Sequence, residues 1–179
     1  MGFKVAERLA REGSGACICG RDTSHLEAAL GRLHSLNGKG RIDGVVADVR
    51  NYLDCRRAIQ YAARQDGRLD ILVNNAGIGI FKPVDQLTPE EWDETIQTNL
   101  SGAFYCCREA IPLMRRQGSG HIFNVSSLLA RHAIPAGAAY SASKFGLNGF
   151  SEAMMEDVRH DGIRVTIIMP GSIATDFGG

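Results

Sequence analysis

Runs of apolar residues that resemble β-strands alternate with helical patterns along the chain, and this alternation constrains the fold more than any other feature. The candidate strands cover residues 15–20, 44–47, 69–74, 121–126 and 163–169. Three of them are nearly continuous runs of Val, Ile and Leu, which are typical of strands buried on both faces of a parallel sheet. Strands joined by helices form βαβ units, so the sequence predicts an open, doubly wound α/β fold.

Helical patterns occupy the remaining segments. They cover residues 2–11, 23–36, 51–65, 88–116 and 140–160. The helix at 88–116 has a strong start signal, because Thr88, Pro89 and Glu91 stand where a capping box needs them. No repeat, linker or low-complexity segment interrupts the alternation over the 179 residues. We therefore expect one domain over residues 1–179.

Composition excludes several classes of protein. Lys plus Arg and Asp plus Glu number 20 each, so the net charge is zero and nothing favours a nucleic-acid partner. No segment reaches the ~18 apolar residues of a membrane span, and the first residues are not a signal peptide, so we expect a soluble, cytoplasmic protein. The five cysteines lack metal-ligand spacing, as do the five histidines. We expect no metal site and interpret the cysteines as small buried thiols.

Tyr140 and Lys144 carry the strongest chemical signal. They are four residues apart on a predicted helix, so the phenol and the ammonium share one face. A neighbouring cation favours the phenolate of a tyrosine, whose pKa is ordinarily about 10, and this suits a group that exchanges a proton. Ser127 ends a buried strand thirteen positions earlier (140 − 127 = 13). Each feature alone has an ordinary explanation, since such a pair arises by chance and serine is common in turns.

Taken together, these residues resemble the short-chain dehydrogenase/reductase family, and the overall sequence is similar to 3-oxoacyl-carrier-protein reductases. That family places a catalytic serine at a strand end and a Tyr-xxx-Lys motif on the next helix, and Ser127, Tyr140 and Lys144 match these positions. Its fourth catalytic residue is an asparagine that interrupts the preceding long helix, which Asn99 in the segment Asn-Leu-Ser-Gly matches. The resemblance implies a Rossmann-like fold and a nicotinamide cofactor.

The resemblance also implies a set of cofactor-binding residues. Gly2 matches the end of the glycine-rich loop, and Asp48 with Val49 matches the residues beside the adenine ring. The remaining candidates lie beside the adenosine half or the nicotinamide of the cofactor: Asn75, Ala76, Gly77, Tyr140, Lys144, Pro170, Gly171, Ile173 and Thr175. Read alone, Asp48 could instead cap the helix at 51–65, and it is the family context that favours contact with the cofactor.

The choice of cofactor depends on the residues after the strand 15–20. An acidic side chain there binds the ribose hydroxyl of NAD, whereas an arginine accommodates the phosphate of NADP. Gly20 occupies the acidic position and Arg21 follows, so we favour NADP(H). Asp22 leaves NAD(H) open as the alternative.

The chain lacks parts that the family has. Family members begin with a strand and a glycine-rich loop, whereas this chain opens on a helix; the C-terminal strand and the helices over the substrate are also absent. The missing first strand is central in the family's sheet, so we expect its two neighbours to lack a partner. We interpret the sequence as part of a normal enzyme, and keep open a naturally short, inactive chain.

The sequence therefore predicts a carbonyl reductase or alcohol dehydrogenase acting on a small molecule, whose substrate is chosen partly by residues 128–139. By this resemblance, Ser127 would hold the carbonyl oxygen and Tyr140 would donate the proton. Lys144 would lower the pKa of Tyr140 and bind the nicotinamide ribose, and Asn99 would hold a water that relays protons to Lys144. The helices at 88–116 and 140–160 match those that pair across subunits in family oligomers, so we expect a homodimer or homotetramer. The alternative is an inactive protein that acts only through this association. A serine hydrolase using His132 is disfavoured, since Ser127 lacks a Gly-x-Ser-x-Gly elbow.

Overall fold

The computed structural model describes residues 1–36, 40–64 and 67–172 of the chain, in which helices and strands alternate as the sequence predicts. In chain order the elements are α1 (Gly2–Arg11), β1 (Ala16–Gly20), α2 (Thr23–His34), β2 (Ile42–Val46), α3 (Tyr52–Ala63), β3 (Ile71–Asn74), α4 (Pro89–Ile96), η1 (Gln97–Ser101), α5 (Gly102–Gln117), β4 (Gly120–Val125), η2 (Leu128–Ala130), α6 (Ala138–Val158) and β5 (Ile163–Ile168). Every candidate strand is present, with ends that lie within two residues of the predicted ones.

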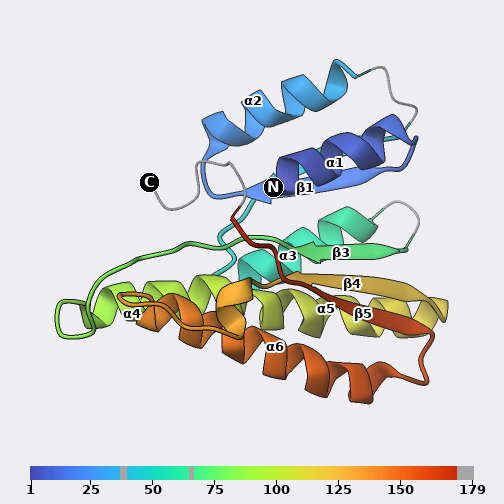
Figure 1. Cartoon of the computed structure of the whole chain (residues 1–179). Helices are drawn as coiled ribbons and strands as arrows, with labels where there is room; N and C mark the ends of the chain where they lie inside the picture. The colour runs from blue at the N-terminus through green and yellow to red at the C-terminus, as the bar shows by residue number, and fades with distance from the viewer. Residues whose placement is uncertain (37–39, 65–66, 173–179) are drawn as a thin grey trace.

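The strands form two parallel sheets. β1 pairs with β2, and β3, β4 and β5 form a second sheet in that order. Figure 1 shows α1 and α2 with β1 in its upper part, and α4, α5 and α6 with β4 and β5 in its lower part. This arrangement confirms the predicted Rossmann-like α/β fold. Neither β1 nor β3 has a ladder partner on its second side among the described strands, which agrees with the expectation for these two strands.

The main core lies between the three-stranded sheet and the helices α5 and α6. Ile122 of β4, Met114 of α5 and Val158 of α6 are each at most 1% exposed within it. The opposite face of this sheet differs from the prediction of strands buried on both faces. Ile71 and Ile168 are 42% and 38% exposed, and Ile71 lines a hollow of about 310 Å³ on that face. The continuous apolar runs therefore overstate how much of the sheet is covered here.

The helix predicted over 88–116 is divided by a turn of π-helix. The capping box forms as predicted, because the Thr88 side chain accepts from the Glu91 amide and the Glu91 carboxylate accepts from the Thr88 amide. At the π-turn η1, the Gly102 amide donates to the carbonyl of Gln97, five residues earlier. π-turns inside α-helices are frequent at functional sites, and this one contains Asn99. The interruption expected at this asparagine is thus confirmed in position.

The structure removes one alternative reading and corrects one interpretation. Asp48 does not cap α3, because Asn51 does so: its side chain accepts from the amides of Leu53 and Asp54. The cysteines are free but not uniformly buried, because Cys19 is exposed.

Among the described residues, no helix has both the length and the apolar character that crossing a bilayer requires.

Candidate active site

The parallel strands bring the candidate residues to one edge. Each strand's carboxyl end carries candidates: Arg21 after β1, Asp48 and Val49 after β2, Asn75, Ala76 and Gly77 after β3, Ser127 after β4, and Pro170 and Gly171 after β5. In open α/β sheets, ligands bind at this edge. Ile173 and Thr175 lie outside the described residues.

Ser127 and Tyr140 form a buried pair of hydroxyl groups. Their exposed fractions are 8% and 7%, and their side chains are hydrogen-bonded to each other. Ser127 is fixed by a local contact, because its Oγ accepts from the Leu129 amide at 3.1 Å and caps η2. The ring of Phe81 packs at 5.6 Å from the ring of Tyr140. Burial raises the pKa of Tyr140 above its usual value, and the hydrogen bond with Ser127 opposes this rise.

Lys144 lies one helical turn after Tyr140 and is 3% exposed. Its Nζ donates to the carbonyl of Val125 at 2.8 Å and stands 5.7 Å from the centre of the Tyr140 ring. Burial lowers the pKa of this lysine to about 8. The expected lowering of the pKa of Tyr140 by Lys144 is not what the structure shows. The ammonium donates to a backbone carbonyl, and burial is the largest influence on the pKa of the tyrosine.

Gly77 lets the backbone after β3 approach the catalytic candidates closely. A Cβ on this residue would stand 3.2 Å from Asn99 Oδ1 and 3.6 Å from Lys144 Nζ. A side chain would therefore fill the space beside the ammonium, whereas glycine keeps it open. A planar ligand that lies against the backbone would need this open space beside the ammonium.

Asn99 joins three elements. Its Oδ1 accepts from the amide of Ile78 at 2.8 Å, and its Nδ2 donates to the Ile78 carbonyl at 2.9 Å and to Ser143 Oγ at 2.9 Å. Ser143 in turn donates to the carbonyl of Tyr140 at 2.7 Å. The side chain of Asn99 thus fastens the segment after β3 to the helix that carries Tyr140 and Lys144. The expected relay water remains a prediction.

Sequence reasoning missed Ser143 and a second series of hydrogen-bonded polar side chains in the core. Asn74 Nδ2 donates to Asn124 Oδ1 at 2.8 Å, and Asn124 Nδ2 donates to Ser151 Oγ at 2.7 Å. This series of hydrogen bonds runs from β3 through β4 to α6. The side chains of Asn124 and Ser151, like that of Ser143, have no exposed surface. The available signal was a polar residue inside an apolar run, since buried polar groups persist only where they are hydrogen-bonded.

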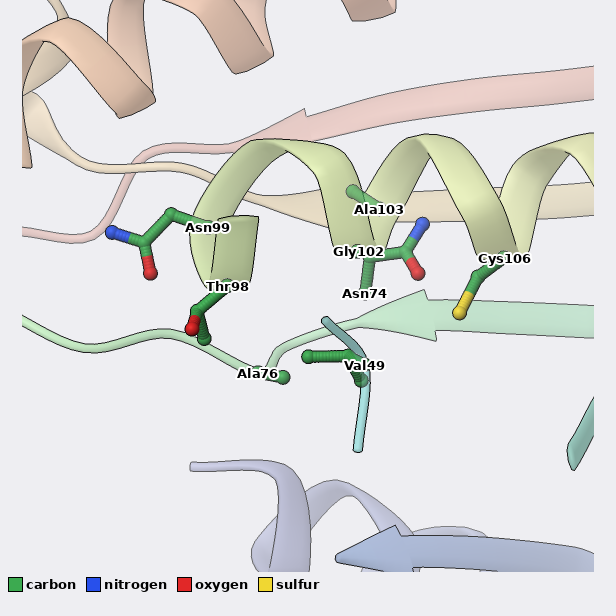
Figure 2. A pocket seen from close by; sticks show the side chains of 8 residues that line it. All are labelled: Val49, Asn74, Ala76, Thr98, Asn99, Gly102, Ala103 and Cys106. Carbon is green, nitrogen blue, oxygen red and sulfur yellow. The ribbon is translucent and has the colours of Figure 1, made fainter. Parts of the chain in front are cut away.

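A small cavity lies between the end of β3 and the start of α5. Figure 2 shows its lining residues, which are Val49, Asn74, Ala76, Thr98, Asn99, Gly102, Ala103 and Cys106. Its volume is about 20 Å³, which is room for one water molecule. Thr98 Oγ1 is buried there and has no hydrogen-bond partner among the described residues. Gly102 permits a close approach, because a Cβ on it would meet Val49 at 3.0 Å.

The charged candidates after β1 and β2 lie together. Arg50 binds the Asp48 carboxylate through Nε and Nη2 at 2.6–3.1 Å, and its hydrogen bonds hold the pKa of Asp48 below the usual range. Arg21 forms an ion pair of 3.6 Å with Glu94. Asp22 is the acidic residue on which the alternative cofactor, NAD(H), depends. Its side chain accepts from the amide of His25 at 2.7 Å and caps α2. Its carboxylate is therefore committed to the helix.

The remaining candidates lie at the ends of the site. A Cβ on Gly2 would stand 2.7 Å from the side-chain nitrogen of Asn75, so these two residues are in close contact. The Pro170 carbonyl accepts from the amide of Leu128 at 3.1 Å, and Gly171 lies against the Leu128 side chain. The described residues contain no group of His, Cys, Asp or Glu that could hold a metal ion.

Comparison with known proteins agrees with this fold. The sequence profile described as "short chain dehydrogenase" matches residues 1–179. A putative short-chain alcohol dehydrogenase from Sinorhizobium meliloti superposes with a TM-score of 0.92 at 32% identity, covering 99% of this chain and 70% of its own. A metagenomic short-chain oxidoreductase solved with NADP gives a TM-score of 0.89 at 33% identity, with 97% and 78% covered.

Curated relatives give the same result. The 3alpha-hydroxysteroid dehydrogenase of Mediterraneibacter gnavus is 31% identical over 177 residues, which cover 99% of this chain and 71% of that protein. The sepiapterin reductase of Chlorobaculum tepidum is 39% identical over 137 residues, covering 76% and 56%. The chain spans from about half to three quarters of the length of such relatives, 51% to 76%.

The fold and the grouping of polar residues at the carboxyl edge define a Rossmann-like α/β protein. The profile match over all 179 residues then places the chain in the short-chain dehydrogenase family.

Proposed function

We propose that this chain carries the site of an oxidoreductase that transfers a hydride between NADP(H) and a carbonyl or alcohol substrate. The observation that carries the proposal is the buried cluster of Ser127, Tyr140 and Lys144, in which two hydroxyls are hydrogen-bonded and an ammonium lies one turn away. Such a cluster supplies a hydrogen-bond donor, a proton donor and a cation at one point, which the reduction of a carbonyl requires.

The residues fit a nicotinamide cofactor. Gly77 leaves space beside Lys144, and Gly2 and Asn75 close the other end of the edge. The cofactor would supply the hydride, so the protein contributes binding, orientation and electrostatics. We place the cofactor along Gly2, Arg21, Asp48, Val49, Asn75, Ala76, Gly77, Tyr140, Lys144, Pro170 and Gly171, with Ile173 and Thr175 proposed from the sequence alone.

Tyr140 is the proton donor in this proposal. Its burial keeps the phenol protonated, since the pKa lies above the usual value. The hydrogen bond from Ser127 stabilises the phenolate that remains after proton transfer. Ser127 also contacts the substrate oxygen, while Asn99 positions the segment after β3 through Ile78.

Lys144 binds the ribose hydroxyls beside the nicotinamide. Its ammonium is desolvated and has a pKa of about 8, so it releases a proton more readily than an exposed lysine. This property suits a group that passes a proton towards Tyr140 after each turnover and regains one from the relay water that we place at Asn99.

NADP(H) is the cofactor that we favour. Arg21 follows β1, where an arginine accommodates the ribose phosphate, and Asp22 is engaged as the cap of α2. Two structural relatives were solved with NADP or 5-hydroxy-NADP, the second being an alcohol dehydrogenase from Thermococcus sibiricus at 25% identity.

A non-catalytic role through self-association is the second candidate. Trp92 on α4, Phe104 on α5 and Phe145 on α6 are exposed by 37%, 42% and 45%. Exposed aromatic side chains of this kind are enriched at interfaces between proteins. Size-exclusion chromatography with light scattering tests this role, and a monomer at high concentration counts against it.

The test of the main proposal is a titration of the 179-residue chain with NADPH and NADH, followed by cofactor fluorescence. Saturable binding, tighter for NADPH, is expected. Tyr140→Phe should retain this binding and lose turnover of carbonyl substrates in any active chain that contains the site. Undiminished turnover by that variant would refute the role of the tyrosine, and a folded chain that binds neither cofactor would refute the proposal.

A further inference from the structure

Two arginines from different strand ends meet at one carboxylate oxygen. Arg21 Nη1 lies 3.6 Å and Arg50 Nη1 lies 2.9 Å from Oε1 of Glu94. Arg21 follows β1, Arg50 follows β2, and Glu94 belongs to α4. The single oxygen of Glu94 therefore marks the point where two guanidinium groups converge on an anion.

The arginines differ in how they are held. Arg50 uses Nε and Nη2 for Asp48, so only its Nη1 is directed at Glu94. Asp48 thus orients the guanidinium of Arg50 without occupying the shared position. The four groups carry two positive and two negative charges, which sum to zero. An additional anion is therefore bound most favourably where it replaces one of the carboxylates.

The position is open to ligands. The side chains of Arg21, Arg50 and Glu94 are 51%, 32% and 38% exposed. Ion pairs between exposed groups are weak, so the Glu94 carboxylate can leave at small cost. A phosphate dianion has more charge and three oxygens available, and it binds a pair of arginines more strongly than one carboxylate does.

We infer that Glu94 occupies the place of the ribose phosphate of NADP(H), and that it competes with this phosphate for Arg21 and Arg50. This inference rests on the proposed function and adds two residues to it. Arg50 is a second ligand of the phosphate. Glu94 weakens the binding of NADP(H) and so reduces the preference for NADP(H) over NAD(H). Because NAD(H) has no phosphate at this position, its binding does not require Glu94 to move.

The experiment compares the chain with Glu94→Gln. Each protein is titrated with NADPH, NADH, adenosine 2′,5′-bisphosphate and 5′-AMP at fixed low salt. The variant should bind NADPH and the bisphosphate about 3- to 10-fold more tightly, the range expected when one or two exposed ion pairs are removed. Its affinities for NADH and 5′-AMP should change less than about twofold. Arg50→Gln should weaken NADPH binding more than NADH binding.

Glu90→Gln is the matched control. Glu90 lies one turn earlier on α4, is exposed, and takes part in none of the ion pairs with Arg21 or Arg50 among the described residues. The Glu90→Gln substitution removes the same charge. It should change neither the affinity for NADPH nor the affinity for NADH relative to the natural chain. Equal tightening of NADPH and NADH in Glu94→Gln, or an equal effect of Glu90→Gln, would mean a general charge effect and overturn the inference.

Other outcomes separate the inference from the proposed function. Unchanged NADPH affinity in Glu94→Gln overturns the inference and leaves the proposed function standing. Unchanged NADPH affinity in Arg50→Gln removes Arg50 from the phosphate site. Failure of all four ligands to bind any of the folded variants overturns the proposed cofactor function together with the inference. Thermal unfolding of each variant shows that it is folded.

Discussion

Replacement of Lys144 by methionine should make the stability of this chain less dependent on pH. Lys144 is 3% exposed, and burial lowers its pKa from 10.5 to about 8. Methionine has a similar length without the charge, so it removes the desolvated ammonium and keeps most of the packing.

The sign and magnitude follow from proton binding. The unfolded chain keeps the lysine protonated up to pH 10.5, whereas the folded chain releases the proton near pH 8. The unfolded state therefore binds more protons between these values, and the stability of the natural chain rises with pH across this window. At about 1.36 kcal/mol per pH unit, the rise attributable to Lys144 is roughly 3 kcal/mol. Below pH 8 the full cost of burying the charge is present.

Lys144→Met removes this cost but leaves the carbonyl of Val125 without its donor, which costs about 1–3 kcal/mol. We expect the variant to be equal to the natural chain or more stable by about 1–2 kcal/mol at pH 7, and less stable at pH 10. Urea unfolding at both pH values measures this difference. Lys4→Met is the control, since the Lys4 side chain is 73% exposed. A difference between Lys144→Met and the natural chain that is the same at both pH values would refute the reasoning.

Three further predictions concern single contacts. Ala136 has a φ of 61°, so Ala136→Gly should raise the free energy of unfolding by about 1 kcal/mol, and a lower melting temperature would contradict this. Gly77→Ala places a Cβ 3.2 Å from Asn99 Oδ1, and should weaken NADPH binding by about tenfold while the chain stays folded. Ser143→Ala leaves an amide proton of Asn99 without its acceptor, and should cost about 1–3 kcal/mol in urea unfolding. A cost below about 0.5 kcal/mol would show that Asn99 finds another acceptor.

Local sequence determined most of the secondary structure. The apolar runs fixed five strands, and Thr88 with Glu91 fixed the start of α4, because these signals depend on residues within one or two turns. The motifs around Asn99, Ser127 and Tyr140, placed on the predicted strands and helices, likewise identified the family, since each motif is short and contiguous. Ser127 and Arg21 were expected directly after strands, and the parallel direction of the strands then places such residues at the carboxyl edge.

The contacts that govern charge and protonation were decided only by the tertiary structure. Glu94 reaches Arg50 across 44 residues of sequence, and Asn99 reaches Ser143 across the same separation. No local pattern encodes such pairs. The pKa of Lys144 and the exposure of Cys19 depend in the same way on how many neighbours the whole fold supplies. Spacing can place a lysine beside a tyrosine. Burial, which arises from every packed element, then shifts the pKa of both groups.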